Sequence, residues 1–455
     1  MAFRRSWVRI PSAPFFLFPV TETDMKVKPP DKKMFFPLVM SILAVSLVTV
    51  AFVDFFAIAQ SNEKSGIDAL KEKVAVLGKL AFKHDVPIDY VNKVQLTKYI
   101  SAIFEKEYPE QLSEQENEFI RLMGFTDDDA HINARKIRKR IFLDNTGGLY
   151  NENTDELLVL DQYREVNYMN SLVLVHELRH ALQDQYFNLA GMLDSRAASD
   201  FDDRRLAVLA ALEGDATFLM VQYGGLDADI LASSPTSDAL MSFLPAAKPS
   251  LLYRDPEIIK NQLSMPYIHG LRFVGAVFEK KKWKGVNRIL HLPPASTEQI
   301  LHPEKYSNRE APVEVLIRYI PGGYRLFHSG VIGEYYLNAL LKSGEDYTDK
   351  EYAQGWGGDT FHIYKNAGSY FLLWESVWDK DIDGANFFSD FKRFIEKRFE
   401  VDLKKGNVKG IDFIAGKSGA REDYFFLVKL KDKIFYARSD NRDQMNALIY
   451  GGNYD

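Results

Sequence analysis

Two histidines and a glutamate in the middle of the chain have the spacing of a metal site. His176 and His180 begin and end the sequence His-Glu-Leu-Arg-His. On a helix this spacing places both imidazoles on one face, one turn apart, where they can hold one Zn²⁺ ion. Glu177 can accept a proton from a water molecule on that ion. The apolar residues 171–175, and the absence of Pro or Gly before residue 191, predict that a buried helix carries the motif.

A zinc site of this kind needs a third protein ligand, and Glu213 is the candidate. It follows residues 205–212, whose composition predicts a second helix beside the first. No third histidine follows His180 at the spacing of the metzincin peptidases. The set His176, His180 and Glu213 resembles that of the gluzincins, the thermolysin-like zinc peptidases. This resemblance implies hydrolysis of a peptide bond, with one Zn²⁺ as cofactor and a peptide or protein as substrate.

A metal-bound imidazole needs an acceptor for its second ring nitrogen, and two aspartates are candidates. Asp184 lies one helical turn after His180, and Asp215 lies two residues after Glu213. In the thermolysin group, the acceptor is an aspartate four residues after the third ligand. Here that position is Thr217, so Asp184 or Asp215 would have to replace it.

Residues 265–270, Met-Pro-Tyr-Ile-His-Gly, resemble the Pro-Tyr-x-x-Gly stretch of the aminopeptidase branch of the gluzincins. The resemblance implies that the Tyr267 hydroxyl donates to the oxyanion formed in the reaction, and His269 is a second candidate donor. That branch also has a Gly-x-Met-Glu-Asn-type strand motif, which recognises the free amine of the substrate. No such motif precedes residue 176, so endopeptidase action is favoured over aminopeptidase action.

Residues 293–303, Pro-Pro-Ala-Ser-Thr-Glu-Gln-Ile-Leu-His-Pro, form another distinctive stretch. Ser296 and Gln299 have the spacing of a capping box, which predicts that a short helix begins there. Together with the HExxH and Glu-Gly-Asp-Ala motifs, this stretch resembles a family of exported bacterial proteins that has no assigned substrate. Glu298 and His302 are further candidates for residues that face the cleft.

The composition is that of a globular protein and does not suggest a nucleic-acid partner. The 455 residues include 57 Lys and Arg against 63 Asp and Glu, which gives a net charge of −6. Two basic runs, residues 135–140 and 280–284, are short and are interpreted as solvated helix ends. The absence of cysteine excludes disulfides, Cys-ligated zinc and thiol catalysis.

An uncharged apolar run at residues 35–53 is long enough to span a bilayer. Four lysines precede it, which predicts that this end stays inside and the rest of the chain is exported. Residues 57–59, Ala-Ile-Ala, match a signal-peptidase site. Two interpretations stay open: a signal peptide cleaved before Gln60, or an uncleaved membrane anchor. Both place the catalytic part outside the cytoplasmic membrane, either anchored to it or free in the periplasm or medium.

These patterns predict five segments. Residues 1–24 resemble the translation of a transfer-RNA gene, so we expect the natural chain to begin at Met25. The other segments are a signal peptide or anchor (25–59), a helical region with a strand near residues 86–94 (60–145), a catalytic domain (146–310) and a C-terminal α+β region (311–455).

The predicted fold is α+β and predominantly helical. Residues 148–160 predict a hairpin just before the HExxH helix. The gluzincin resemblance implies a small antiparallel sheet there, whose edge strand pairs with the extended substrate. In the C-terminal region, residues 326–341 and 387–399 predict helices, and residues 424–437 predict a hairpin.

Two other functions remain open at this point. The protein could be a catalytically inactive, zinc-binding surface or assembly module. It could also be a zinc hydrolase that cleaves a non-peptide bond, such as an amide in the cell wall. Replacement of Glu177 tests the first alternative, and a comparison of peptides with peptidoglycan fragments tests the second.

Overall fold

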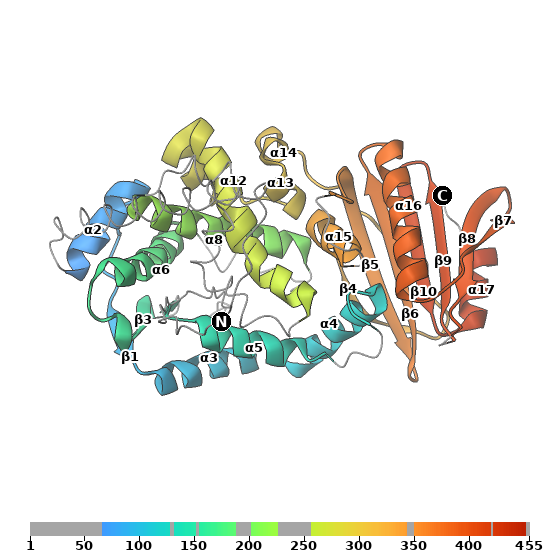
Figure 1. Cartoon of the computed structure of the whole chain (residues 1–455), viewed down its shortest axis with the longest axis horizontal. Coiled ribbons are helices and arrows are strands. Elements are labelled where there is room, and N and C mark those ends of the chain that lie inside the picture. Colours follow the sequence, from blue (N-terminus) through green and yellow to red (C-terminus); the bar gives the residue numbers. More distant parts are fainter. Residues whose placement is uncertain are drawn as a thin grey trace, which may run out of the picture.

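The computed structural model describes residues 66–127, 132–151, 154–187, 202–225, 256–343, 350–419 and 422–451. The predicted segments 1–24 and 25–59 lie outside these ranges. The fold is α+β, with more residues in helices than in strands. Figure 1 shows long helices in one half of the molecule and a large sheet in the other.

Most of the region predicted to be helical between residues 60 and 145 does form helices. These are α2 (Ile67–Gly78), α3 (Lys93–Glu107), α4 (Glu110–Met123) and α5 (Ala134–Asn145). A capping box starts α3, because the Asn92 side chain accepts from the Gln95 backbone and the Gln95 side chain accepts from the Asn92 backbone. Gly124, in the left-handed conformation, ends α4.

A three-stranded sheet lies before the HExxH helix. The predicted hairpin is confirmed, with β2 (Gly148–Asn151) antiparallel to β3 (Glu156–Leu160) and a short 3₁₀ turn, Asp161–Tyr163, after it. The strand order is β1-β3-β2, and β1 (Ile88–Val91) pairs with β3 in parallel. The expectation of a purely antiparallel sheet is therefore wrong. Helices α3 to α5 separate β1 from β3, and a crossover of that length permits parallel pairing.

Three helices carry the candidate metal ligands together with Glu177 and Tyr267. They are α6 (Tyr168–Tyr186), α8 (Asp203–Tyr223) and α12 (Glu257–Ile289). Asn167 and Asp202 cap the first two by accepting from backbone amides of the first turn. The third contains Pro266 and departs from helical geometry at Lys282 (φ 49°, ψ −160°), so it consists of two helices joined at a kink.

One described helix, α8, is long and apolar enough to cross a membrane. In the structure, 78% of its apolar window is buried inside the molecule. It packs against both α6 and α12, which makes it a core helix of the helical half. The predicted membrane-spanning segment, residues 35–53, lies outside the described residues.

The C-terminal part contains a seven-stranded antiparallel sheet with helices on both faces (Figure 1). The strand order is β4-β5-β6-β10-β9-β8-β7. The elements after α12 are α13 (Thr297–Leu301), α14 (Pro303–Asn308), β4 (Arg325–Gly330), α15 (Gly333–Lys342), β5 (Trp356–Asn366), β6 (Ser369–Trp378), α16 (Asp381–Arg398), β7 (Lys404–Val408), β8 (Ile411–Lys417), β9 (Tyr424–Leu430), β10 (Lys433–Ser439) and α17 (Arg442–Gly451).

Both faces of this sheet are apolar. Along β6, Leu372 and Trp374 join the main core, where Trp374 packs against Phe391 of α16. Phe371 and Leu373 point to the other face and join a second core with residues of α17. Because successive side chains of a strand point to opposite faces, a nearly continuous apolar strand is covered on both sides.

Local predictions in this part had mixed outcomes. The hairpin at 424–437 is confirmed as β9 and β10, and the helix at 387–399 is confirmed within α16. The prediction of one helix over 326–341 is wrong, because its first residues form β4. Pairing with β5 supplies the backbone hydrogen bonds of that segment, and α15 begins only after Gly330.

Candidate metal centre

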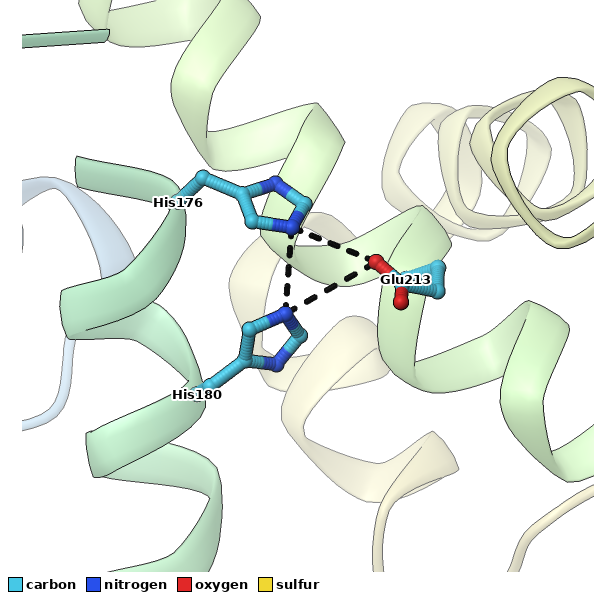
Figure 2. A group of neighbouring side chains, drawn as sticks. All are labelled: His176, His180 and Glu213. Atoms are coloured by element: carbon cyan, nitrogen blue, oxygen red, sulfur yellow. Dashed lines mark hydrogen bonds and ion pairs between the residues drawn. The ribbon is translucent and has the colours of Figure 1, made fainter. Parts of the chain in front are cut away.

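The three residues with metal-ligand spacing meet between α6 and α8. Figure 2 shows the imidazoles of His176 and His180 pointing from one helix toward the carboxylate of Glu213 on the other. The Nε2 atoms of the two histidines are 3.1 Å apart. Oε2 of Glu213 lies 3.2 Å from Nε2 of His176 and 3.7 Å from Nε2 of His180. Each of the three side chains is at most 5% exposed.

These separations fit one tetrahedral zinc ion. With zinc–ligand distances near 2.05 Å, the edges of a tetrahedral site are about 3.3 Å long. The three measured separations lie on either side of that value. Two nitrogens and one carboxylate oxygen also form the donor set of catalytic rather than closed structural sites.

The charges of the three groups depend on one another. Burial alone would raise the pKa of Glu213, but hydrogen bonds and charge from the two histidines hold it below its usual value. Burial alone would lower the pKa of His180, but the contact with Glu213 holds it above its usual value. The site thus keeps an ionised carboxylate beside a proton-binding imidazole, and a divalent cation would displace that proton.

A buried chain of hydrogen bonds fixes the orientation of His180. Its Nδ1 lies 2.8 Å from Oε1 of Gln183. The Gln183 amide nitrogen donates to the backbone oxygen of Leu212 and to Asp215, both at 2.9 Å. Because both partners are acceptors only, the amide oxygen must face the imidazole. His180 therefore donates through Nδ1, so loss of the proton on Nε2 would leave the Nε2 lone pair directed toward the ligand set.

Arg179 anchors the far end of this chain. Its guanidinium donates two hydrogen bonds to Asp215, at 2.7 and 2.9 Å, and a third to Asn287. The side chain is fully buried and lies against the ring of Trp283. A bidentate pair holds the Asp215 carboxylate in one orientation, so Gln183 is held as well.

The structure separates the two aspartates that were predicted to orient the ligands. Asp215 acts on His180 through Gln183. Asp184 accepts a hydrogen bond from the Tyr150 hydroxyl of β2 at 3.2 Å, and so ties the hairpin to the HExxH helix. Sequence reasoning had assigned no role to Gln183 or Arg179. The available signal was that Gln183 lies three residues after His180, on the same helical face.

Glu177 lies next to both the ligand set and the hairpin. It is 1% exposed. A Cβ atom added to Gly148 of β2 would lie 3.3 Å from Cγ of Glu177. The missing side chain at Gly148 therefore leaves room for the carboxylate between the sheet and α6.

Tyr267 reaches the centre from α12. Its hydroxyl donates to Oε1 of Glu213 at 3.1 Å, and its ring stacks on His176 with the centroids 6.3 Å apart. This approach requires close crossing of α8 and α12. A Cβ added to Gly214 would lie 2.2 Å from the backbone of Gly270, and one added to Gly270 would lie 2.1 Å from the backbone oxygen of Ala210.

His269, Glu298 and His302 do not join the ligand set. Two residues along a helix turn the side chain by about 200°, so His269 points away from Tyr267, and its ring contacts Tyr335 of α15. His269 and His302 line a separate cavity of about 740 Å³. His302 pairs there with Glu334 at 2.9 Å. The prediction that these three residues face the substrate cleft stays a prediction, and the structure places none of them among the three candidate ligands.

Glu298 belongs to a second group of three carboxylates, with Glu310 and Asp379. The ammonium of Lys305 lies 2.6 Å from Glu298, 2.6 Å from Glu310 and 2.5 Å from Asp379. A tethered cation thus already occupies the middle of this group. Ser296 caps α13 as predicted, but the Gln299 side chain accepts from Ala295 and not from the cap residue.

One part of the chain matches a known protein family. The family described as "Domain of unknown function (DUF8575)" matches residues 324–447. This range runs from β4 into α17, so it coincides with the seven-stranded sheet and does not contain the metal centre. The comparisons with curated proteins and with solved structures found no match.

Proposed function

We propose that the chain is a zinc-dependent peptidase, with endopeptidase action favoured, that works outside the cytoplasmic membrane. The convergence of His176, His180 and Glu213 at the separations of a tetrahedral site carries the proposal. The adjoining carboxylate of Glu177 distinguishes this arrangement from a purely structural zinc site, which has no need of a base.

The ligand residues would be His176, His180 and Glu213. A zinc ion held there would supply Lewis-acid activation of water and of the substrate carbonyl. The hydrogen-bond chain from Arg179 to His180 would hold one imidazole in the tautomer that binds a cation.

Glu177 would transfer a proton from the attacking water to the leaving group. Its position beside the ligand set allows it to accept a proton from the attacking water and pass it to the leaving amine. Because Cγ of Glu177 lies against Gly148 of β2, the sheet restricts where the carboxylate can point.

The hairpin offers a way to bind an extended substrate. Among the described strands, β2 is one of the two edge strands of its sheet, and Gly148 of β2 lies next to Glu177. A peptide that paired with β2 would bring its backbone to the ligand set, with recognition through main-chain hydrogen bonds. The Tyr267 hydroxyl could then leave Glu213 and donate to the developing oxyanion, which exchanges one hydrogen bond for another.

The decisive experiment measures zinc content and casein cleavage in the purified protein, as wild type and as Glu177→Gln. We expect one zinc ion per chain in both, and a loss of cleavage of about 10²–10⁴-fold in the variant, as for removal of a general base. Glu165→Gln is the matched control, because this glutamate is exposed and lies outside the centre.

Two results would contradict the proposal. Folded protein that contains no zinc would show that the three candidate ligands do not form a zinc site. Zinc in both proteins with no cleavage by either would favour an inactive binding module or a non-peptide substrate, and peptidoglycan fragments would then test the second of these.

A further inference from the structure

A cavity of about 390 Å³ lies beside the C-terminal half of α12 and the end of α14. Four of its lining side chains are cationic, and none is acidic. The cations are Lys280, Lys281, Arg288 and Arg309. We call this the cationic cavity. It is a site distinct from the metal centre, since no ligand residue lines it.

These four cations have no ion-pair partner among the described residues. Neighbouring lysines do have such partners. Lys305, one turn before Arg309, is held by three carboxylates. Those three carboxylates are thus engaged by Lys305, and the described residues provide no ion-pair partner for the four cations of the cavity.

The two arginines line the same cavity, although they come from different elements. Arg288 lies in the last turn of α12, and Arg309 follows α14 in the left-handed conformation (φ 58°). Burial raises the pKa of the Tyr306 hydroxyl, and the charges of Arg288 and Arg309 both oppose that increase. Both guanidiniums therefore lie within electrostatic range of this hydroxyl, which also lines the cavity.

Gly285 lines the cavity and packs closely against Lys281, since a Cβ added there would lie 2.4 Å from Cβ of Lys281. A solvated helix end would account for Arg288, because a cation stabilises a helix C-terminus. It does not account for Arg309 on another element or for a concave surface without any acidic residue.

We propose that the cationic cavity binds the phosphate group of a larger molecule. Guanidinium forks match a tetrahedral oxyanion, and two ammonium groups add charge without geometric demand. The volume is within the range of small-molecule sites, about 300–1,000 Å³, and exceeds what phosphate alone needs. Apolar walls such as Val277 and Leu292 would contact the remainder of the ligand. The phosphate can belong to a free metabolite or to an anionic lipid headgroup.

The test is calorimetric titration of the full chain, freed of metal by a chelator, with inorganic phosphate at low ionic strength. The variant is Arg288→Gln/Arg309→Gln, in which both residues are exposed, so the fold is retained. The control is Lys284→Gln/Arg325→Gln, which removes two exposed cations that do not line the cavity. We expect saturable binding, weakened at least tenfold in the first variant and unchanged in the control.

Titration with monomeric dihexanoyl-phosphatidylglycerol shows whether the phosphate belongs to a lipid headgroup or to a free metabolite. Dihexanoyl-phosphatidylcholine is the zwitterionic comparison. Binding of the glycerol lipid that is tighter than that of phosphate and is lost in Arg288→Gln/Arg309→Gln assigns a lipid headgroup. Tighter binding of phosphate assigns a free phosphate compound. Equal weakening in both variants, or no saturable binding of either probe, overturns the proposal. Zinc content should be the same in all of these proteins, so failure here leaves the peptidase proposal untouched.

Discussion

His180 presents Nε2 to the metal centre because three other side chains fix its opposite nitrogen. Gln183 accepts from Nδ1, Asp215 holds Gln183, and Arg179 holds Asp215. All of them are buried, so each hydrogen bond lies in a low dielectric where an unpaired polar group is costly. At the residue scale, the orientation of this candidate ligand thus depends on side chains outside the candidate ligand set.

Removal of Gln183 should therefore weaken metal binding. We expect Gln183→Leu to lower zinc affinity by about 10–100-fold, because the His180 tautomer is no longer fixed. Competition with a chromogenic chelator measures this directly. Gln185→Leu is the control, since Gln185 contacts Lys83 and His84 on the surface. Equal affinities in the two variants would show that Gln183 is only a packing residue.

Tyr267 has two candidate tasks, and one substitution separates them. If its hydroxyl stabilises the oxyanion, Tyr267→Phe should lower kcat/KM for a peptide by about 10²–10³-fold with zinc affinity retained. Steady-state kinetics on the zinc-loaded variant gives the answer. A fall in zinc affinity with normal turnover of the loaded protein would instead assign Tyr267 to positioning Glu213.

At the scale of elements, the crossing of α8 and α12 brings Tyr267 to Glu213, the third candidate ligand. The two helices touch through the backbones of Gly214 and Gly270. These glycines lie one residue from Glu213 and three residues from Tyr267, so both motifs contain the residue that permits the contact. The hairpin is attached to α6 in a comparable way, through Tyr150 and Asp184.

Gly270→Ala should force the two helices apart. The new methyl group would lie 2.1 Å from the backbone oxygen of Ala210, which cannot rotate away. Overpacking of this kind costs about 1–3 kcal/mol of folding free energy. We expect a lower melting temperature and weaker zinc binding, because Glu213 moves with α8. Gly451→Ala, where no atom lies within 4 Å, should change neither.

At the scale of the whole molecule, two buried carboxylates join the helical half to the sheet. Asp203 starts α8 and accepts from the backbone of Thr297 in α13. Asp359 of β5 accepts from the backbones of Ile332 and Gly333 and from Trp356. Burial is the main cause that raises the pKa of each, and their mutual repulsion raises that of Asp203 further.

This junction should make stability depend on pH. Burial raises the pKa of Asp359 to about 6, compared with 3.8 in an unfolded chain. The folded state then binds the extra proton, so stability from this group is present at low pH and is lost as pH rises through about 6. Over the whole range from 3.8 to 6 the loss of folding free energy is on the order of 3 kcal/mol, because one pKa unit corresponds to about 1.4 kcal/mol.

Urea unfolding of the wild type and of Asp359→Asn at pH 5 and pH 8 measures the effect. We expect the wild type to lose stability relative to the variant between these values. Asp402→Asn, at a residue whose side chain is 81% exposed, should show no such change. A pH-independent difference between wild type and Asp359→Asn would mean that folding does not shift the titration of this carboxyl between pH 5 and pH 8.

The sequence by itself determined the features that depend on local periodicity. The HExxH helix, the hairpins at 148–160 and 424–437, and the mixed α+β class all follow from side chains that repeat with the period of a helix or a strand. The three metal-ligand candidates also follow locally, because the spacing within one helix fixes two of them and the motif context gives the third.

Features that depend on contacts between elements were decided only by the tertiary structure. The parallel pairing of β1 with β3 depends on a partner far along the chain. The same is true of β4 at the start of residues 326–341, which pairs with β5. The same holds for the Gln183–Asp215–Arg179 chain, for the separation of His269 and His302 from the metal centre, and for the cationic cavity. The physical reason is that a helical or strand pattern fixes which face a side chain occupies, whereas the packing of elements fixes which groups meet it.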